Sequence, residues 1–244
     1  MKYASKTDIG RRLRNEDACL VPQAGENRPL IAVADGMGGH AAGELASTLL
    51  IAGLAREHET IAISDDSADA LEKAIQRINV EIFRMAQGEE NCHGMGSTLV
   101  CALLLPERYY AASIGDSRLY HLHDDILEQI TEDHSLVEML VLSGQITREE
   151  ARTHPQRNFI TRAAGLALRA QIDVFERGWR QGDILLLSSD GLHGSITDDE
   201  MRDILQTAPS LDDAADTLVS LALERGASDN ITVALAQNDE EGSV

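Results

Sequence analysis

Short apolar runs rich in β-branched residues recur along this chain, separated by turns or by longer stretches with apolar residues at helical spacing. The short runs predict strands, and they lie near 2–8, 17–21, 30–34, 97–105, 109–114, 117–122, 126–130, 172–177, 183–188 and 230–236. The longer stretches predict helices over 40–57, 67–86, 135–143, 197–206 and 211–225. Strands and helices do not alternate strictly, so the order favours an α+β fold with antiparallel sheets packed against helical layers.

Two segments carry clear turn and capping signals. YHLHDDILEQIT predicts a hairpin that turns at Asp124 and Asp125. SLDDAADTLVSLALERG predicts a helix that begins after Ser210 and ends at Gly226. The sequence has no internal repeat, low-complexity segment or Pro- and Ser-rich linker. We therefore expect residues 1–244 to form one domain.

The amino-acid composition limits the kinds of molecule that this protein can bind. The chain has 244 residues and a formal net charge of -20, which argues against nucleic acid or anionic lipid, since both bind basic patches. No apolar run approaches the roughly 20 residues that cross a bilayer, and MKYASKTDIG lacks the apolar stretch of a signal peptide. Three cysteines without a CxxC pair indicate neither a disulfide framework nor a zinc site. We expect a cytoplasmic monomer with no membrane partner.

Acidic residues recur where apolar runs begin or end. Any one of them has a simple explanation, because Asp-Gly, Gly-Asp and Asp-Asn are common turn dipeptides. Turn chemistry alone does not explain the whole set, which comprises Glu16, Asp17, Asp35, Asp116, Asp190 and Asp229. If these strand ends meet at one edge of a sheet, the repulsion between carboxylates has to be offset, and divalent cations are suited to that role.

The candidate ligands in this set are all oxygen atoms: carboxylates, together with the carbonyl of a glycine such as Gly36. Oxygen-only sites favour Mg²⁺ or Mn²⁺, allow Ca²⁺ and disfavour Zn²⁺. Gly36, Gly38 and Gly39 have no side chains, so the loop that they form can bring a carbonyl oxygen close to an ion.

A dinucleotide site is the competing interpretation of the same segment. GMGGHA, with Gly36, Gly38 and Ala41, matches the G-x-G-x-x-A fingerprint between a strand and a helix. Against it, Asp35 lies directly before the first glycine and would repel a pyrophosphate. No strand that ends in a ribose-binding acid follows about twenty residues later. The metal site is the better interpretation.

Six segments occur in order and together resemble one family: RLRNED, VADGMGG, GMGSTLV, IGDSRLY, SSDGLHG and SDNITV. They look like the motifs of the metal-dependent PP2C-type (PPM) protein serine/threonine phosphatases in their compact bacterial form, and the resemblance runs from Thr7 to Val233. It implies a four-layer αββα sandwich of two antiparallel β-sheets flanked by helices. It also implies a small mobile flap subdomain, which corresponds to residues 143–170 of this chain.

The resemblance assigns metal ligands by position. Asp35 would bridge two metal ions. Asp190 and Asp229 would complete the coordination of one ion. The Gly36 carbonyl and Glu16, partly through water, would serve the other.

Further roles follow from the same resemblance. Asp17 would support the metal ligands from beside them, and Asp116, with Asp190, would hold a third and weaker ion. Arg12 matches the arginine that grips the substrate phosphate, for which a planar fork of donors is suited. Met37 stands where many eukaryotic relatives have a histidine proposed to protonate the leaving group. We hypothesise that a water near Asp116 supplies that proton instead.

The resemblance implies an enzyme that hydrolyses phosphoserine and phosphothreonine in proteins, opposing a Ser/Thr protein kinase. Hydroxide that bridges two Mn²⁺ or Mg²⁺ ions would attack phosphorus directly, without a phosphoenzyme. An inactive relative that serves as a binding module is a second hypothesis. The presence of Asp35, Asp190 and Asp229 argues against it.

Histidines outside the acidic set are interpreted as structural. His40 begins a predicted helix, and His121 and His123 share one face of a predicted strand, where alternating polarity explains them more simply than a metal does. We assign no catalytic role to His193.

Four other polar residues have supporting or peripheral roles. Ser97 and Thr98 lie in no G-x-S-x-G elbow and are expected to support the strand and the acidic residues. Asn230 is expected to orient Asp229 or the last strand. Arg162, in the flap segment, is a candidate substrate contact.

Overall fold

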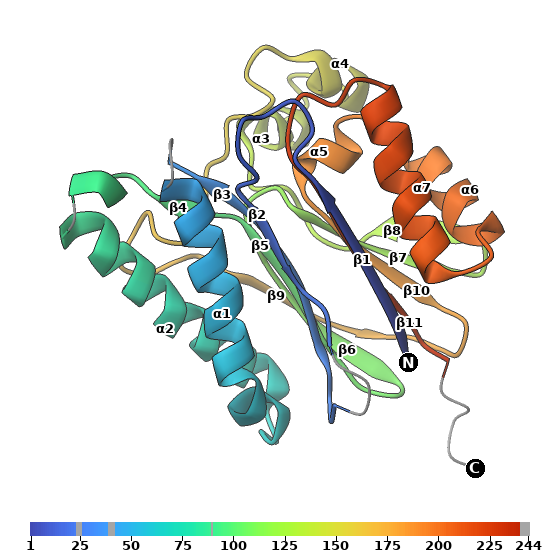
Figure 1. The fold of residues 1–244 in the computed structure, drawn as a ribbon, viewed down its shortest axis with the longest axis horizontal. Coiled ribbons are helices and arrows are strands. Elements are labelled where there is room, and N and C mark those ends of the chain that lie inside the picture. Colours follow the sequence, from blue (N-terminus) through green and yellow to red (C-terminus); the bar gives the residue numbers. More distant parts are fainter. Residues whose placement is uncertain (23–25, 39–41, 89, 240–244) are drawn as a thin grey trace.

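The computed structural model describes residues 1–22, 26–38, 42–88 and 90–239. Within these residues, two antiparallel sheets lie face to face between layers of helices (Figure 1). The strand order of the first sheet is β1 (Lys2–Asp8), β11 (Ile231–Gln237), β10 (Ile184–Ser188), β7 (Arg118–His123) and β8 (Ile126–Gln129). That of the second is β2 (Asp17–Leu20), β3 (Leu30–Met37), β5 (Leu99–Leu104), β6 (Arg108–Ile114) and β9 (Asp173–Gly178), with β4 (Gly96–Ser97) paired to β3. The predicted α+β class is confirmed.

Helices cover the outer face of each sheet (Figure 1). The second sheet is covered by α1 (Ala42–Ala62) and α2 (Ser67–Gly88), and a short 3-10 turn, η1 (Glu90–Cys92), comes after α2. The first sheet is covered by α5 (Asp190–His193), α6 (Asp198–Thr207) and α7 (Leu211–Glu224). At one end of the sandwich lie α3 (Leu136–Leu142) and α4 (Arg148–Thr153). The layers therefore follow the order helix, sheet, sheet, helix.

Central strands are apolar on both faces because each sheet is covered on both sides. In β3, Ile31 and Val33 belong to the core between the sheets, whereas Leu30 packs against the helices of the second sheet. Leu185 and Leu187 of β10 meet that inter-sheet core from the first sheet. Burial of apolar surface, at about 25 cal/mol per Å², is the main stabilising contribution.

The predicted hairpin and the last predicted helix are confirmed. β7 and β8 pair antiparallel, and Asp124 and Asp125 have φ values of 45° and 65°. Such left-handed values at both central residues are those of a two-residue type I′ turn. Ser210 caps α7 by accepting a hydrogen bond from the Asp213 N–H, and Gly226, with φ 80°, follows its end.

Local departures from the predicted elements have local causes. The predicted strand 97–105 is divided into β4 and β5 at Thr98, whose N–H donates to the Asp35 carbonyl at 2.8 Å. Two short helices were not predicted. α4 has no buried residue and is held by a capping box between Thr147 and Glu150, and α5 is a single turn directly after β10.

The dinucleotide interpretation is wrong. β3 pairs antiparallel with both β2 and β5, so the strand before the glycines is not part of a parallel βαβ unit. Of the glycine segment, Gly39, His40 and Ala41 lie outside the described residues.

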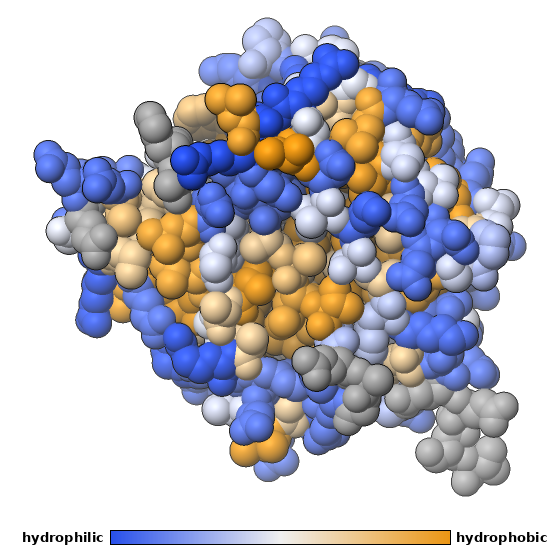
Figure 2. All heavy atoms as spheres, in the orientation of Figure 1, coloured by the Kyte–Doolittle hydropathy of each residue, from blue (hydrophilic) through white to orange (hydrophobic). Residues whose placement is uncertain are grey.

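Apolar residues are visible along the seam between the two sheets on the face drawn in Figure 2, with hydrophilic residues over the neighbouring helices. Tyr3 of β1 and Cys19 of β2 are partly buried against the inter-sheet core at these two edge strands. In the part of the chain that the structure describes, no helix combines the length and the apolar character needed to span a membrane.

Candidate functional site

Five strand ends that carry aspartates meet at one end of the two sheets. Because neighbouring strands are antiparallel, the start of β2 lies beside the end of β3, and the end of β10 lies beside the starts of β11 and β7. The loops before β2 and before β11 lie at this end, near α3 (Figure 1). The aspartates that influence one another there, called the acidic cluster from here on, are Asp17, Asp35, Asp116, Asp190 and Asp229.

Asp17 and Asp35 lie opposite each other across the β2–β3 pair. Like charges at such positions destabilise a sheet. Burial raises the pKa of Asp17 to about 6. Burial, followed by the negative charge of Asp17, raises the pKa of Asp35 well above its ordinary value. The pair therefore requires a proton or a cation close by to be stable.

Asp190 reaches the acidic cluster from the other sheet, and Asp116 reaches it from the turn that joins the two sheets. Asp190 is the first residue of α5, directly beyond β10, and Asp116 lies in the turn between β6 and β7. Burial raises the pKa of Asp116 to about 7. Burial also raises the pKa of Asp190 well above its ordinary value, and the charges of Asp116 and Asp229 raise it further. Carboxylates of both sheets thus share one electrostatic environment.

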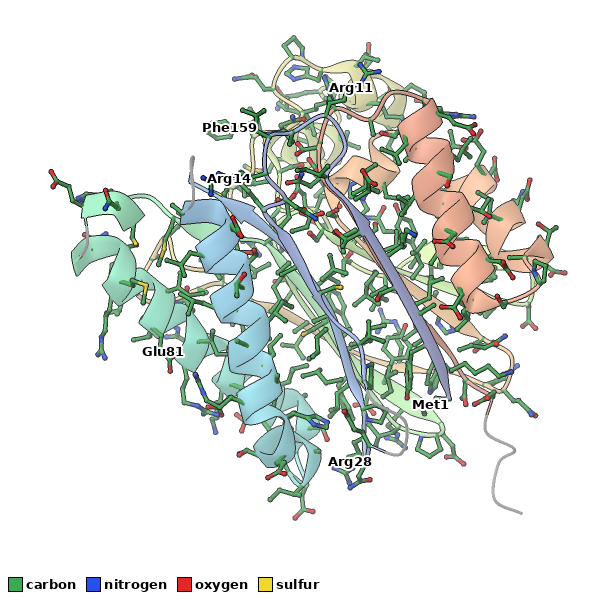
Figure 3. The ribbon with its side chains drawn as sticks, viewed as in Figure 1. Met1, Arg11, Arg14, Arg28, Glu81 and Phe159 are labelled. Atoms are coloured by element: carbon green, nitrogen blue, oxygen red, sulfur yellow. The ribbon has the colours of Figure 1, made fainter. Side chains whose placement is uncertain are left out.

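The loop between β1 and β2 places Arg12 beside the acidic cluster, where it contacts Asp229. Arg12 Nη2 donates to Asp229 Oδ2 at 2.6 Å, while half of the Arg12 side chain (50%) stays exposed. Arg11 and Arg14 of the same loop lie at the end of the molecule that also carries Phe159 (Figure 3). The mouth of the acidic cluster is therefore flanked by cations in an otherwise acidic protein.

Asn230 fixes this loop from the first residue after Asp229. Its Nδ2 donates to the carbonyls of Ile9 and Arg14, each at 2.9 Å. Its Oδ1 accepts a hydrogen bond from the Glu16 N–H at 2.8 Å. The backbone N–H of Asn230 donates to Asp229 Oδ1 at 2.9 Å, so the expected orientation of Asp229 comes from the backbone. The side chain instead holds the loop, a role that the sequence did not indicate.

Glu16 lies at the end of this loop, next to the acidic cluster. Burial is the largest cause that raises its pKa, while the charge of Arg12 lowers it and that of Asp229 raises it. The Glu16 carbonyl accepts hydrogen bonds from the Gly36 N–H at 3.0 Å and from Ser47 Oγ at 2.6 Å. Glu16 is thereby fixed against β3 and α1, beside the other predicted ligands.

The glycines after Asp35 and Asp190 are required by backbone packing. A Cβ at Gly36 would lie 2.0 Å from the Gly43 carbonyl oxygen, so no side chain fits between β3 and α1. A Cβ at Gly191 would lie 2.0 Å from the Asn230 carbonyl oxygen. Close packing thus requires glycine at position 36 independently of any ion, a reason that the sequence did not reveal.

Hydroxyl groups support the acidic cluster from behind. Thr98 Oγ1 accepts from the Asp35 N–H and Ser97 Oγ donates to the Asp35 carbonyl, each at 3.0 Å. Their expected supporting role is confirmed. Ser189, which sequence reasoning missed, donates to Asp17 Oδ2 at 2.7 Å and accepts from the Thr232 N–H at 2.9 Å. Ser189 directly precedes Asp190, and this position is the only sequence signal that could have found it.

Arg162 is held outside the acidic cluster. Its Nη1 lies 3.2 Å from Asp173 Oδ1 and 3.1 Å from His134 Nε2. His134 Nδ1 accepts from the Gly115 N–H at 3.0 Å, which assigns its proton to Nε2, 2.9 Å from Asp173 Oδ2. Arg162 therefore donates to Asp173, a carboxylate that does not belong to the acidic cluster.

The chemistry of the acidic cluster fits hard divalent cations. Among the described residues, the buried side-chain oxygens without a hydrogen-bond partner include Asp17 Oδ1 and Asp190 Oδ1. No group of three His, Cys, Asp or Glu side chains within the described residues is already positioned to coordinate one metal ion. Mg²⁺ needs no such group, because it uses one or two carboxylates and keeps several waters. Unpartnered oxygens in an open arrangement fit that type of ion.

A family model for Protein phosphatase 2C matches residues 6–236 of this chain. The chain belongs to the PP2C family of protein phosphatases. Serine/threonine phosphatase stp of Listeria monocytogenes is 40% identical over 238 residues, covering 96% of this chain and 94% of that protein. The family named from six sequence segments is thereby confirmed.

Solved structures of PP2C-type phosphatases share the fold. Serine/threonine phosphatase Stp1 from Staphylococcus aureus superposes with a TM-score of 0.92 at 39% identity, covering 99% of this chain and 95% of that one. The catalytic domain of serine threonine protein phosphatase PstP, in complex with two manganese ions, has a TM-score of 0.85 at 38% identity, covering 97% of each chain. This chain is accordingly a protein serine/threonine phosphatase of the PP2C type.

Proposed function

We propose that this PP2C-type phosphatase hydrolyses phosphoserine and phosphothreonine in proteins at the acidic cluster, with two Mn²⁺ or Mg²⁺ ions as cofactors. Aspartates from both sheets with unpartnered buried oxygens are the observation that carries the proposal. The PstP catalytic domain with two manganese ions supports it by similarity. When bound, such ions lower the pKa of water towards neutrality and so supply a nucleophile.

The ligands in this proposal come from both sheets. Asp35, at the centre of the electrostatic interactions, would be shared between the two ions, with Asp190 and Asp229 on one side. Glu16 and the Gly36 carbonyl would serve the other side, with Asp17 supporting Asp35 across the strand pair. Asp116, buried near Asp190, would contribute to a third and weaker site.

Arg12 would bind the substrate phosphate. Its Nη2 is occupied by Asp229, but the half-exposed guanidinium has further donors that face solvent. A planar fork next to the reacting phosphorus orients the phosphate and stabilises the charge that spreads over its oxygens. Asp229 in turn holds Arg12 at the mouth of the acidic cluster.

Other parts of the proposal concern the surroundings of the site. Residues 143–170 would act as a flap, and Arg162, whose side chain is 37% exposed, would contact bound substrate from it. The substrates would be phosphoproteins produced by a Ser/Thr protein kinase in the cytoplasm, consistent with three free cysteines in the described residues.

Turnover of a phosphothreonine peptide and of p-nitrophenyl phosphate tests the proposal, with Mn²⁺, Mg²⁺ or a chelator. Wild-type protein should turn over both substrates only with metal. Asp190→Ala should reduce turnover by about 1,000-fold, since it removes a ligand and one unpartnered oxygen. Turnover that persists in chelator would contradict the proposal. Metal-dependent peptide binding without turnover would favour a binding module.

Direct hydrolysis is tested separately. Rapid acid quenching with ³²P-labelled substrate should trap no phosphorylated protein. A covalently labelled chain would show instead that a side chain attacks phosphorus.

A further inference from the structure

A cavity of about 180 Å³ adjoins the acidic cluster. Asp116 and Asp190 lie in its wall together with His193 of α5. Residues of α3 and α4, and of the segment that follows α4, form much of the remaining wall. The cavity greatly exceeds the roughly 30 Å³ that one water molecule occupies in the liquid. It has room for a charged side chain next to the site where phosphate would bind.

Two arginines of the cavity wall are already neutralised. Arg118 donates through Nε and Nη2 to the carboxylate of Asp133 at 2.7 to 3.1 Å. Arg148 donates to both oxygens of Glu138, at 3.1 and 3.2 Å. These pairs shape the cavity but leave little charge for a ligand.

Arg152 and Arg157, in and after α4, remain open to a ligand. Arg152 uses Nη2 for the Ile196 carbonyl at 3.2 Å, which leaves its other donors available. The guanidinium of Arg157 has no hydrogen bond or ion pair within the part of the chain that the structure describes. Both side chains are exposed and line the cavity. Exposed guanidinium groups on a cavity wall are suited to binding an anion.

Besides the two paired carboxylates and the acidic-cluster residues Asp116 and Asp190, the wall carries the carboxylate of Asp198 and the imidazole of His193. Asp198, in the first turn of α6, is stabilised there by the helix N-terminus. Burial lowers the pKa of His193 well below its ordinary value, and the positive charges of Arg118 and Arg152 lower it further. Arg152 and Arg157 are therefore the arginines of this wall that no carboxylate of the described residues pairs, and they share the cavity lining with the carboxylates of Asp116 and Asp190.

We propose that this cavity is an anion subsite, in which Arg152 and Arg157 hold a second negatively charged side chain of the substrate polypeptide. The ligand is a phosphoserine, phosphothreonine or acidic residue near the phosphorylated residue that is hydrolysed. An acidic protein repels such substrates at long range, so local cations decide which of them dock. The inference rests on the proposed function, since it places the reacting phosphate at the acidic cluster.

Matched phosphothreonine peptides test the subsite. One carries a phosphoserine, a second a glutamate and a third an alanine at about two to six residues from the phosphothreonine, since extended chain spans about 3.3 Å per residue. The readout is the ratio of kcat/KM for loss of the phosphothreonine phosphate alone, followed by mass spectrometry at that residue, between each anionic peptide and the alanine peptide at one ionic strength. Wild-type protein should favour the anionic peptides by about tenfold, the range of two accessible charge-assisted contacts.

Variants of the two arginines test whether the preference for anionic peptides arises in the cavity. Arg157→Gln should reduce the ratio to about threefold, and the double variant Arg152→Gln with Arg157→Gln should bring it close to one. Arg84→Gln, an exposed position on α2, removes the same charge far from the cavity and should keep the wild-type ratio. A preference for phosphoserine alone identifies the ligand as a second phosphate. A preference for both anionic peptides identifies negative charge in general.

Two results would overturn the subsite: a wild-type ratio near one, or a ratio that survives in the double variant. Failure of the proposed function is distinguishable from both. In that case wild-type protein with Mn²⁺ would not hydrolyse p-nitrophenyl phosphate, a substrate too small to reach the cavity and the acidic cluster together.

Discussion

Both ends of the β-sandwich contain buried ionisable side chains, but these side chains are hydrogen-bonded to different extents at the two ends. At the end where β10 finishes and β7 starts, the unpartnered buried oxygens include Asp17 Oδ1 and Asp190 Oδ1 among the described residues. Towards the other end of the same two strands, His121 has a partner at each ring nitrogen. Tyr109 Oη lies 3.3 Å from Nδ1, and Asp183 Oδ2 lies 3.1 Å from Nε2.

The histidine end is a complete hydrogen-bond network. Burial lowers the pKa of His121, which favours the neutral ring, and Nε2 is placed to donate to Asp183. Asp183 also accepts from the Arg180 N–H at 2.7 Å, and Tyr109 packs edge-on against the His121 ring at 5.6 Å between centroids. The partners of His121 are protein groups, in agreement with its structural interpretation from the sequence.

The two ends show that buried polar side chains can have opposite effects on stability. A fully paired network stabilises and orders a core, whereas unpartnered carboxylates lower stability until protons or cations neutralise them. Substitutions at the two ends should therefore have opposite effects on stability and on turnover.

The largest effect is expected for Asp35→Asn. Turnover with Mn²⁺ should fall by about 1,000-fold or more, since the carboxylate proposed to be shared by two ions is lost. In chelator the same change should raise the melting temperature by several degrees, because it relieves the repulsion from Asp17. Calorimetry and peptide turnover measure the two effects. A lower melting temperature in chelator would show that the acidic cluster is not a source of strain.

The next largest effect concerns pH in the absence of metal. Folding raises the pKa values of Asp17 and Asp116 from 3.8 to about 6 and about 7, so the native state binds more protons than the unfolded state. Their stabilising contribution is complete below about pH 4 and is lost as pH rises through about 6 and 7. One pKa unit corresponds to about 1.4 kcal/mol, so the two shifts together correspond to a loss of roughly 7 kcal/mol between these limits, part of it between about pH 5 and 8.

Urea unfolding at a series of pH values between about 5 and 8 measures this loss. In chelator, the free energy of unfolding should fall as pH rises. Saturating Mn²⁺ should weaken or reverse that trend, because bound cations replace the protons. Identical pH profiles with and without metal would argue against ions at the acidic cluster.

At the histidine end, Asp183→Ala should lower the free energy of unfolding by about 1–3 kcal/mol, since it leaves His121 and the Arg180 N–H without their acceptor. Turnover with Mn²⁺ should stay within about twofold of wild type. Asp183→Asn, which keeps an acceptor for Arg180, should be less destabilising. Loss of turnover in folded Asp183→Ala protein would mean that the two ends are coupled.

At the acidic end, the smallest effect on turnover is expected for Asn230→Ala, which removes a paired amide. The loop that carries Arg12 would lose three hydrogen bonds. We expect kcat/KM for a phosphopeptide to fall by about tenfold, mainly through KM, because Arg12 is less well placed to meet the phosphate. Unchanged kinetics in Asn230→Ala would show that Asp229 alone positions Arg12.

The amino-acid sequence by itself determined the elements and the placement of acids at their ends. Apolar runs and turn residues act over a few neighbours, so the strands, the Asp124–Asp125 hairpin and the Ser210 cap were predictable. The arrangement of six segments further indicated the family and hence the αββα architecture.

Only the tertiary structure decided which groups are paired. Arg12 meets Asp229 across 217 positions of sequence, and Asn230 reaches the same loop from the far end of the chain. The register between β2 and β3 places Asp17 opposite Asp35. Arg162 forms an ion pair with Asp173. Burial, strand register and hydrogen-bond pairing depend on distant residues that fold side by side. Residue type and spacing therefore place a carboxylate at a strand end, but long-range packing determines whether its oxygens are left for a cation.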